Sequence, residues 1–272
     1  MGQRIITRFA ILLLFPLGLA CSFLRPKPPL TWHMTLEVDA VASDRDAAVQ
    51  QLIRVTERRL NLVGVSNFVV QAQGRPANGR LRVSLPDVPD RERLKKLITA
   101  IGRLQLTAVI SPASPAPAQT YRTKEEAIAS LGGTVPANRR VLPYVERAEL
   151  ATGGDRSERW VVVEFPPIVD GSDLRNATAF PSRAGEDYQI AFALTPTGAE
   201  KIGSWTGSHI NDYLGVVLND EVKSIAYIKG QISDQGQISG RFTKESAEDL
   251  AQVLNSGALP AAVKIVEEGS DK

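Results

Sequence analysis

The chain has 272 residues, of which 43% are hydrophobic and 23% charged, a balance that is ordinary for a globular protein and excludes global disorder. Its 32 lysines and arginines nearly match its 30 aspartates and glutamates, so the formal net charge is only +2. This balance argues against a nucleic-acid-binding protein, which usually carries a concentrated basic face.

The N-terminal segment has the features of a targeting signal. Arg4 and Arg8 precede an apolar stretch, residues 9–24, that is shorter than the ~20 residues needed to span a bilayer comfortably. Cys21, the only cysteine, follows small residues as in a bacterial lipoprotein signal and is a candidate for lipid attachment. An uncleaved anchor and a simple cleaved signal remain alternatives. Residues 1–29 are therefore predicted to be a signal or anchor that ends in a stiff, proline-rich spacer.

The pattern of apolar residues over residues 31–110 predicts a series of strands and helices. Alternate residues from Trp32 to Val38 form the apolar face of a strand, and Asp44 can cap a helix that ends before Gly64. The complete predicted order is strand 31–41, helix 44–63, strands 68–73 and 80–85, a helix to about residue 101, and strand 104–110. This β-α-β-β-α-β order is the plan of a ferredoxin-like domain.

The next segment breaks the pattern. Residues 111–118 read Ser-Pro-Ala-Ser-Pro-Ala-Pro-Ala, a proline density that excludes a continuous helix or strand ladder. A short helix is predicted around residues 124–130, and two glycine pairs punctuate the rest. We therefore expect a linker and hinge region over residues 111–157.

The second half predicts a further set of strands and helices. Thr195-Pro196 is typical of a helix start, and Asn219-Asp220 is typical of a tight hairpin turn. Residues 170–173 are expected to form a turn that leads into a short helix, and residues 235–236 a turn within extended chain. The other predicted elements are strands 160–165, 188–194, 214–218, 222–228 and 261–266, and a last helix that starts near Thr243 and ends at Gly257.

Several stretches resemble the SecD family of protein-export subunits. Glu57–Val65 is similar to the family's "RLN-LGV" helix end, and Val70–Gly74 and Arg82–Pro86 are similar to the strands that follow it. Val169–Leu174 resembles "TGxDL", and Phe192–Ala199 resembles "F-LTPEGA". The remaining similar stretches are Leu214–Val222, Ser239–Ala247 and Ser256–Pro260, the last of which matches "SGALP".

The resemblance implies an α+β fold with a ferredoxin-like base formed by both ends of the mature chain and an inserted α+β head. The expected division is residues 30–110 and 241–268 in the base, 111–157 as linker and hinge, and 158–240 in the head. The motif residues to which the resemblance assigns structural roles are Gly64, Gly171, Asp173, Leu174, Thr195, Pro196, Gly198, Gly240, Phe242, Gly257, Leu259 and Pro260.

The sequence also departs from the family pattern. SecD proteins carry further membrane helices after this region, and the sequence given ends at Lys272 without them. His209 and Asn211 stand where the family usually has Asn and Gly. We therefore expect a soluble part of the SecD machinery without a proton-driven cycle of its own.

Patterns typical of catalysis are weak throughout. The two histidines, His33 and His209, have no carboxylate or thiol at a metal-binding or catalytic spacing. Asp170 and Asp173 flank Gly171-Ser172, which favours turn formation and helix capping over acid–base chemistry. The sequence therefore predicts a protein that is not an enzyme and has no cofactor, metal or nucleic-acid site.

Two functional hypotheses follow. In the first, the chain is anchored to the cytoplasmic membrane, faces the periplasm or exterior, and contacts translocating or unfolded polypeptide beside SecD/SecF or the Sec translocon. In the second, it is an envelope adaptor or structural lipoprotein that reuses the SecD fold without a role in export.

Overall fold

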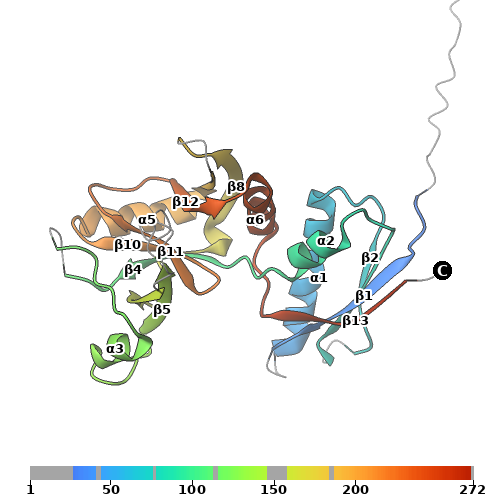
Figure 1. Ribbon diagram of the computed structural model, residues 1–272, viewed down its shortest axis with the longest axis horizontal. Helices are drawn as coiled ribbons and strands as arrows, with labels where there is room; N and C mark the ends of the chain where they lie inside the picture. Colours follow the sequence, from blue (N-terminus) through green and yellow to red (C-terminus); the bar gives the residue numbers. More distant parts are fainter. Residues whose placement is uncertain are drawn as a thin grey trace, which may run out of the picture.

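The computed structural model describes residues 27–40, 44–75, 78–112, 116–145, 158–183 and 187–270. They form the expected α+β fold, with a base that contains both ends of the described chain and a head inserted between them (Figure 1). Cys21 and the N-terminal apolar segment lie outside the described residues. Within the described ranges, no helix is long and apolar enough to cross a membrane.

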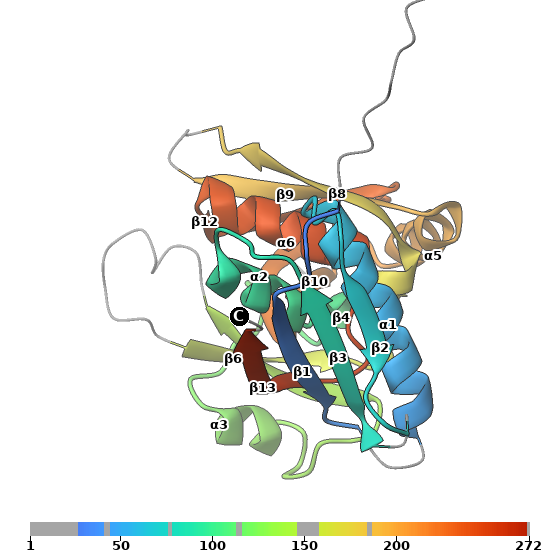
Figure 2. The ribbon, with the colours of Figure 1, turned by 90° about the vertical axis from the view of Figure 1, so that its right-hand side faces the viewer.

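The base is a four-stranded sheet with the order β13-β1-β3-β2, the strand order of a ferredoxin-like domain. Its elements are β1 (Trp32–Val38), α1 (Arg45–Leu62), β2 (Val69–Ala72), β3 (Arg80–Leu85), α2 (Arg91–Thr99) and β13 (Val263–Ser270). The alternation predicted for β1 is confirmed, because Trp32, Met34, Leu36 and Val38 are all buried in one core. Residues of α1 and α2 cover this core, which Figure 2 shows from the base side of the molecule.

The prediction that strand 104–110 completes the base sheet is wrong. The strand exists as β4 (Leu104–Val109), but it pairs with β10 (Tyr213–Leu218) in the head. Its place beside β1 is taken by β13, which pairs with β1 along the whole strand, from Trp32–Ser270 to Val38–Val263. Alternating apolar residues specify a strand but do not specify its partner.

The described residues of the head form two sheets. A six-stranded sheet has the order β10-β11-β5-β6-β4-β7, and β10 also pairs with β4; a three-stranded sheet has the order β12-β9-β8. The remaining elements are α3 (Lys124–Ala129), β5 (Arg139–Val145), β6 (Glu158–Glu164), β7 (Val169–Asp170), the 3-10 turn η3 (Gly171–Asp173), β8 (Leu174–Pro181), β9 (Tyr188–Leu194), α5 (Pro196–Ser208), β11 (Glu221–Tyr227), β12 (Gln235–Phe242) and α6 (Lys244–Ser256). Buried residues of both sheets, α5 and α6 share one core.

The segments that pass between base and head differ from those predicted. Residues 111–157 were expected to be the hinge, but α3 and β5 pack within the head, where β5 pairs with β6 over seven residue pairs. Helix α6 was expected in the base, but Ala247, Ala251 and Leu254 are buried in the head core. The chain instead crosses at residues 100–103 and 257–262, between α2 and β4 and between α6 and β13.

Two local turn predictions also need correction. The short helix after the Asp170 turn is η3 itself, and strand β8 follows it directly. Residues 235–236 do not turn but begin β12, where they pair with Ala193 and Phe192 of β9. A glycine stands at position 236 because a Cβ atom there would lie 2.3 Å from Phe192 Cζ. By contrast, the Asn219-Asp220 hairpin is confirmed, with φ of 53° and 61° at the two turn residues.

Candidate functional site at the junction of base and head

The two crossing segments lie against each other. The backbone N–H of Leu259 donates a hydrogen bond of 2.9 Å to the carbonyl of Ile101. Leu259 is 1% exposed and belongs to the base core, although it directly follows the end of a head helix. Gly102 has a φ of +72°, and a Cβ atom there would lie 2.5 Å from Val253 Cγ1 of α6. The chain therefore has little free space where it passes between the lobes.

Arg59 of α1 is buried at this junction and contacts both crossings. Its side chain is 2% exposed. Nη1 donates to the carbonyls of Leu97, Ile98 and Ala100 at 2.7, 2.8 and 2.6 Å. Nε donates to Ser256 Oγ at 3.0 Å, and Nη2 donates to the carbonyl of Gly257 at 3.2 Å. One guanidinium thus joins the end of α2, the first crossing and the end of α6.

These partners of Arg59 are neutral oxygen atoms rather than a carboxylate. Burial lowers the pKa of Arg59 from its ordinary value to about 10, so the side chain remains a cation at neutral pH. A buried charge is tolerated only when its hydrogen bonds are satisfied, and Arg59 uses all three of its nitrogen atoms as donors.

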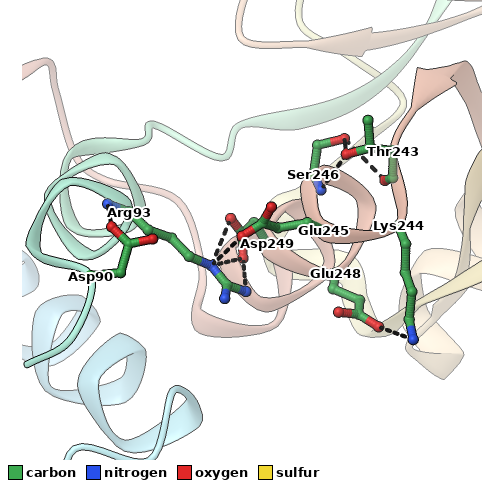
Figure 3. A network of polar contacts seen from close by, with 8 residues as sticks. All are labelled: Asp90, Arg93, Thr243, Lys244, Glu245, Ser246, Glu248 and Asp249. Carbon is green, nitrogen blue, oxygen red and sulfur yellow. Dashed lines mark hydrogen bonds and ion pairs between the residues drawn. The ribbon is translucent and has the colours of Figure 1, made fainter.

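A second polar contact joins α2 of the base to α6 (Figure 3). Arg93 Nη2 lies 2.6 Å from Asp249 Oδ1, and Nε lies 3.0 Å from the same oxygen; Glu245 Oε1 is 3.6 Å from Arg93 Nε. The hydrogen bond to Asp249 raises the pKa of Arg93. Side-chain caps fix the starts of both helices, because Asp90 accepts from the N–H of Arg93 and Thr243 accepts from that of Ser246.

A groove of about 720 Å³ opens beside Ser256 and Gly257, two of the hydrogen-bond partners of Arg59. Its walls come from α1, from η3 and β8, and from the chain between the end of α6 and Pro260. Arg54 and Arg58 of α1 are exposed along one wall, whereas Leu174 and Pro260 contribute partly exposed apolar side chains. The groove therefore combines a cationic wall with apolar surface, at the place where base and head meet.

Five of the motif residues line this groove: Gly171, Leu174, Gly257, Leu259 and Pro260. Gly257 has a φ of +91° and ends α6, as its sequence position predicts. Of the other motif residues, Gly64 (φ +79°) follows the end of α1, and Gly240 and Phe242 lie in β12.

The remaining four motif residues, Asp173, Thr195, Pro196 and Gly198, meet at the start of α5. Thr195 accepts a hydrogen bond from the N–H of Gly198, and Pro196 occupies the first turn of the helix. Asp173 is 4% exposed, and Lys201 Nζ lies 2.9 Å from each of its carboxylate oxygens. This cluster holds α5 against η3; none of its four residues lines the groove, although Asp173 lies between Ser172 and Leu174, which do.

The groups considered for catalysis have structural partners. Asp170 accepts hydrogen bonds from the hydroxyl and the N–H of Ser172, at 2.7 and 2.8 Å, and the hydroxyl contact is the main cause of its lowered pKa. His209 stacks on Trp205 with ring centroids 4.2 Å apart. The described part of the chain contains no group of three or more side chains that could hold a metal ion.

The sequence analysis did not single out Arg59, although a signal was present. Arg59 follows Val55 and Thr56 by four and three positions, which places it on the buried face of α1. A charged residue at a helical core position is a candidate for a special role, because arginine is rarely buried without partners.

Comparisons with known proteins identify the family. The model of the "SecDF, P1 head subdomain" matches residues 146–261, and that of the N-terminal part of the SecDF P1 domain matches residues 49–111. The chain is 33% identical to SecD of Koribacter versatilis over 245 residues and 32% identical to SecD of Aquifex aeolicus over 224 residues. The chain belongs to the SecD family and corresponds to its P1 domain. These alignments cover 89% and 82% of the chain but only 42% and 40% of the relatives, so the chain spans less than half their length.

Solved structures agree with this assignment. One, described as a membrane component SecDF that enhances protein export, is 27% identical with a TM-score of 0.62, over 86% of this chain and 98% of that one. A crystal structure of SecDF in a super-membrane-facing form is 26% identical with a TM-score of 0.64, over 90% of this chain and 32% of that one. The ferredoxin-like base and the inserted head are therefore the architecture of the P1 domain.

Proposed function

We propose that this chain assists Sec-dependent protein export by contacting translocating or unfolded polypeptide in the groove between base and head. The observation that carries the proposal is the position of the groove, which is lined by Gly171, Leu174 and the Gly257–Pro260 segment, all within motifs that resemble SecD. Its relatives are named as subunits of a protein translocase.

The groove has the chemistry to hold a chain without a fixed sequence. The partly exposed side chains of Leu174 and Pro260 can contact hydrophobic residues, and Arg54 and Arg58 can contact carboxylates or backbone carbonyls. The groove is open to solvent and lies between two lobes rather than inside one. Such a site accepts an extended segment more readily than a compact ligand.

The proposed location is the outer side of the cytoplasmic membrane. The N-terminal segment would anchor the chain there, through Cys21 or as a helix, and the Sec translocon or a SecD/SecF complex would be its neighbour. The base contains the first described strand, β1, so an anchor at the N-terminus would keep the base near the membrane.

In-cell photo-crosslinking tests the proposal. A photoreactive amino acid replaces Gln51 or Arg54 on the α1 wall, or Ser172 on the η3 wall, with Glu125 on α3 of the head as the matched exposed control. Secretory precursors arrested in the translocon should crosslink to the three groove positions and much less to position 125. Capture of one folded envelope protein, with no precursor or Sec subunit, would instead establish an adaptor. Equal capture at all four positions would remove the groove as the contact site.

A further inference from the structure

The ends of two helices, each followed by a crossing segment, converge on Arg59. The carbonyls of Leu97 and Ile98 belong to the last turn of α2, and the Gly257 carbonyl follows the last turn of α6. Carbonyl groups at a helix C-terminus carry partial negative charge, which a buried cation neutralises. Arg59 therefore interacts with the C-terminus of a base helix and the C-terminus of a head helix at once.

We propose that Arg59 is the positioning residue that fixes the orientation of the head relative to the base and thereby the shape of the groove. The chain connects the lobes at residues 100–103 and 257–262, and Arg59 binds the start of each connection, at Ala100 and at Gly257. A change in the angle between the lobes has to move at least one of these carbonyls.

The rigidity of the guanidinium makes this contact selective for one arrangement. Its nitrogen atoms are fixed in a plane, so acceptors that bind all of them are held at fixed separations. If the lobes rotate relative to each other, the guanidinium can no longer donate hydrogen bonds to the acceptors of α2 and of α6 at the same time. The cation then loses hydrogen-bond partners while it is still buried. The alternative orientation is therefore disfavoured until Arg59 gains water or other acceptors.

Arg59 is also coupled to the groove through its own helix. Arg54, Val55 and Arg58 line the groove from α1, and the Ser256–Pro260 segment that Arg59 holds lines it as well. A fixed crossing therefore means a fixed groove width. The consequence for polypeptide binding rests on the proposed function, whereas the role in lobe orientation does not.

Distances between spin labels in the full-length chain test the proposal. In a Cys21→Ser background, Gln71→Cys on β2 and Glu125→Cys on α3 place one label on each lobe. Arg59→Lys keeps the charge but loses the planar fork, and Arg59→Met keeps the length but loses every donor. Arg58→Lys is the matched control, since Arg58 is the exposed neighbour on the same helix.

A broader or shifted distance distribution in both Arg59 variants, with that of Arg58→Lys unchanged, is the expected result. Hydrogen exchange provides the second measurement. The amide of Leu259, bonded to Ile101 across the two crossings, should exchange roughly tenfold faster or more in Arg59→Lys, while amides in β1 and β9 keep their protection. Retained β1 and β9 protection shows that both lobes are folded.

Unchanged distances together with an unchanged Leu259 amide in a folded Arg59→Lys protein would overturn the proposal. Loss of protection in β1 and β9 as well would also overturn it, because Arg59 would then support the fold rather than the orientation. Neither result depends on client capture, so a failed crosslinking experiment and a failed positioning role are distinguishable.

Discussion

Base and head are both α+β, but they differ in how far apart along the chain their core partners lie. In the base, β1, α1, β2, β3 and α2 follow one another from Trp32 to Thr99, and only β13 comes from elsewhere. In the head, Val109 pairs with Tyr213, and Asn255 exchanges two hydrogen bonds with the backbone of Ala177. The base is thus specified mostly by local patterns, whereas the head depends on contacts between distant segments.

The largest expected effect is the loss of stability when a core side chain is truncated. This experiment tests whether the difference in sequence separation makes the two lobes separate folding units. Leu36 in β1 and Ile190 in β9 are both 0% exposed, so truncation of either to alanine should cost about 2–5 kcal/mol. If the lobes unfold separately, Leu36→Ala should speed amide exchange in the base alone and Ile190→Ala in the head alone.

Val266→Ala in β13 is the control, because this side chain is 47% exposed and its loss should change stability by less than about 0.5 kcal/mol. Equal loss of protection in both lobes after either core substitution would show that the junction couples them into one unit. In that case the two lobes would unfold together, although their core partners differ in sequence separation.

The same difference explains what could be predicted from the sequence. Signals that act within a few residues are confirmed: Thr195 as a helix cap, Gly257 as a helix end, and the Asn219-Asp220 hairpin. The resemblance to SecD supplied the two-lobed plan. The partner of β4 could not be predicted, because an apolar alternation fits either sheet. The start of β12 was missed because Gly236 is typical of a turn, whereas here a glycine is needed for the close approach of the Phe192 ring.

The second prediction concerns a close approach within the head. A Cβ atom on Gly198 would lie 2.8 Å from Asp173 Cβ and 3.0 Å from the Asp173 carbonyl oxygen, so Gly198→Ala should destabilise the head by about 1–3 kcal/mol. Gly171→Ala, two residues before Asp173, has no atom within 4 Å of its Cβ and serves as the control. If the two variants unfold at the same denaturant concentration, α5 can move away from η3 with little loss of stability.

A smaller effect is expected for the ion pair that joins the lobes. Arg93 is 38% exposed and Asp249 is 24% exposed, so solvent screens the pair, and its coupling energy should be about 0.2–1 kcal/mol. A double-mutant cycle with Arg93→Ala and Asp249→Ala measures this value. The coupling should fall as salt is added. A value well above this range would mean that the ion pair, and not only Arg59, holds the base against α6.

The smallest effect is on the response to acid, and here the two lobes should differ in their sensitivity to salt. Asp170 in the head and Glu268 in the base both have lowered pKa values, so each contributes stability above its ordinary pKa of 3.8 or 4.5 and loses it as the pH falls through the lowered value. The main cause is the neutral hydroxyl of Ser172 for Asp170, but the cation of Lys95 for Glu268. Because salt screens a charge but not a hydroxyl hydrogen bond, carboxylate titrations by NMR should show that added salt raises the pKa of Glu268 more than that of Asp170. Ser172→Ala should raise the pKa of Asp170 but not that of Glu268. An equal salt response at the two sites would mean that the charge of Lys201 lowers the pKa of Asp170 more than the hydrogen bonds from Ser172 do.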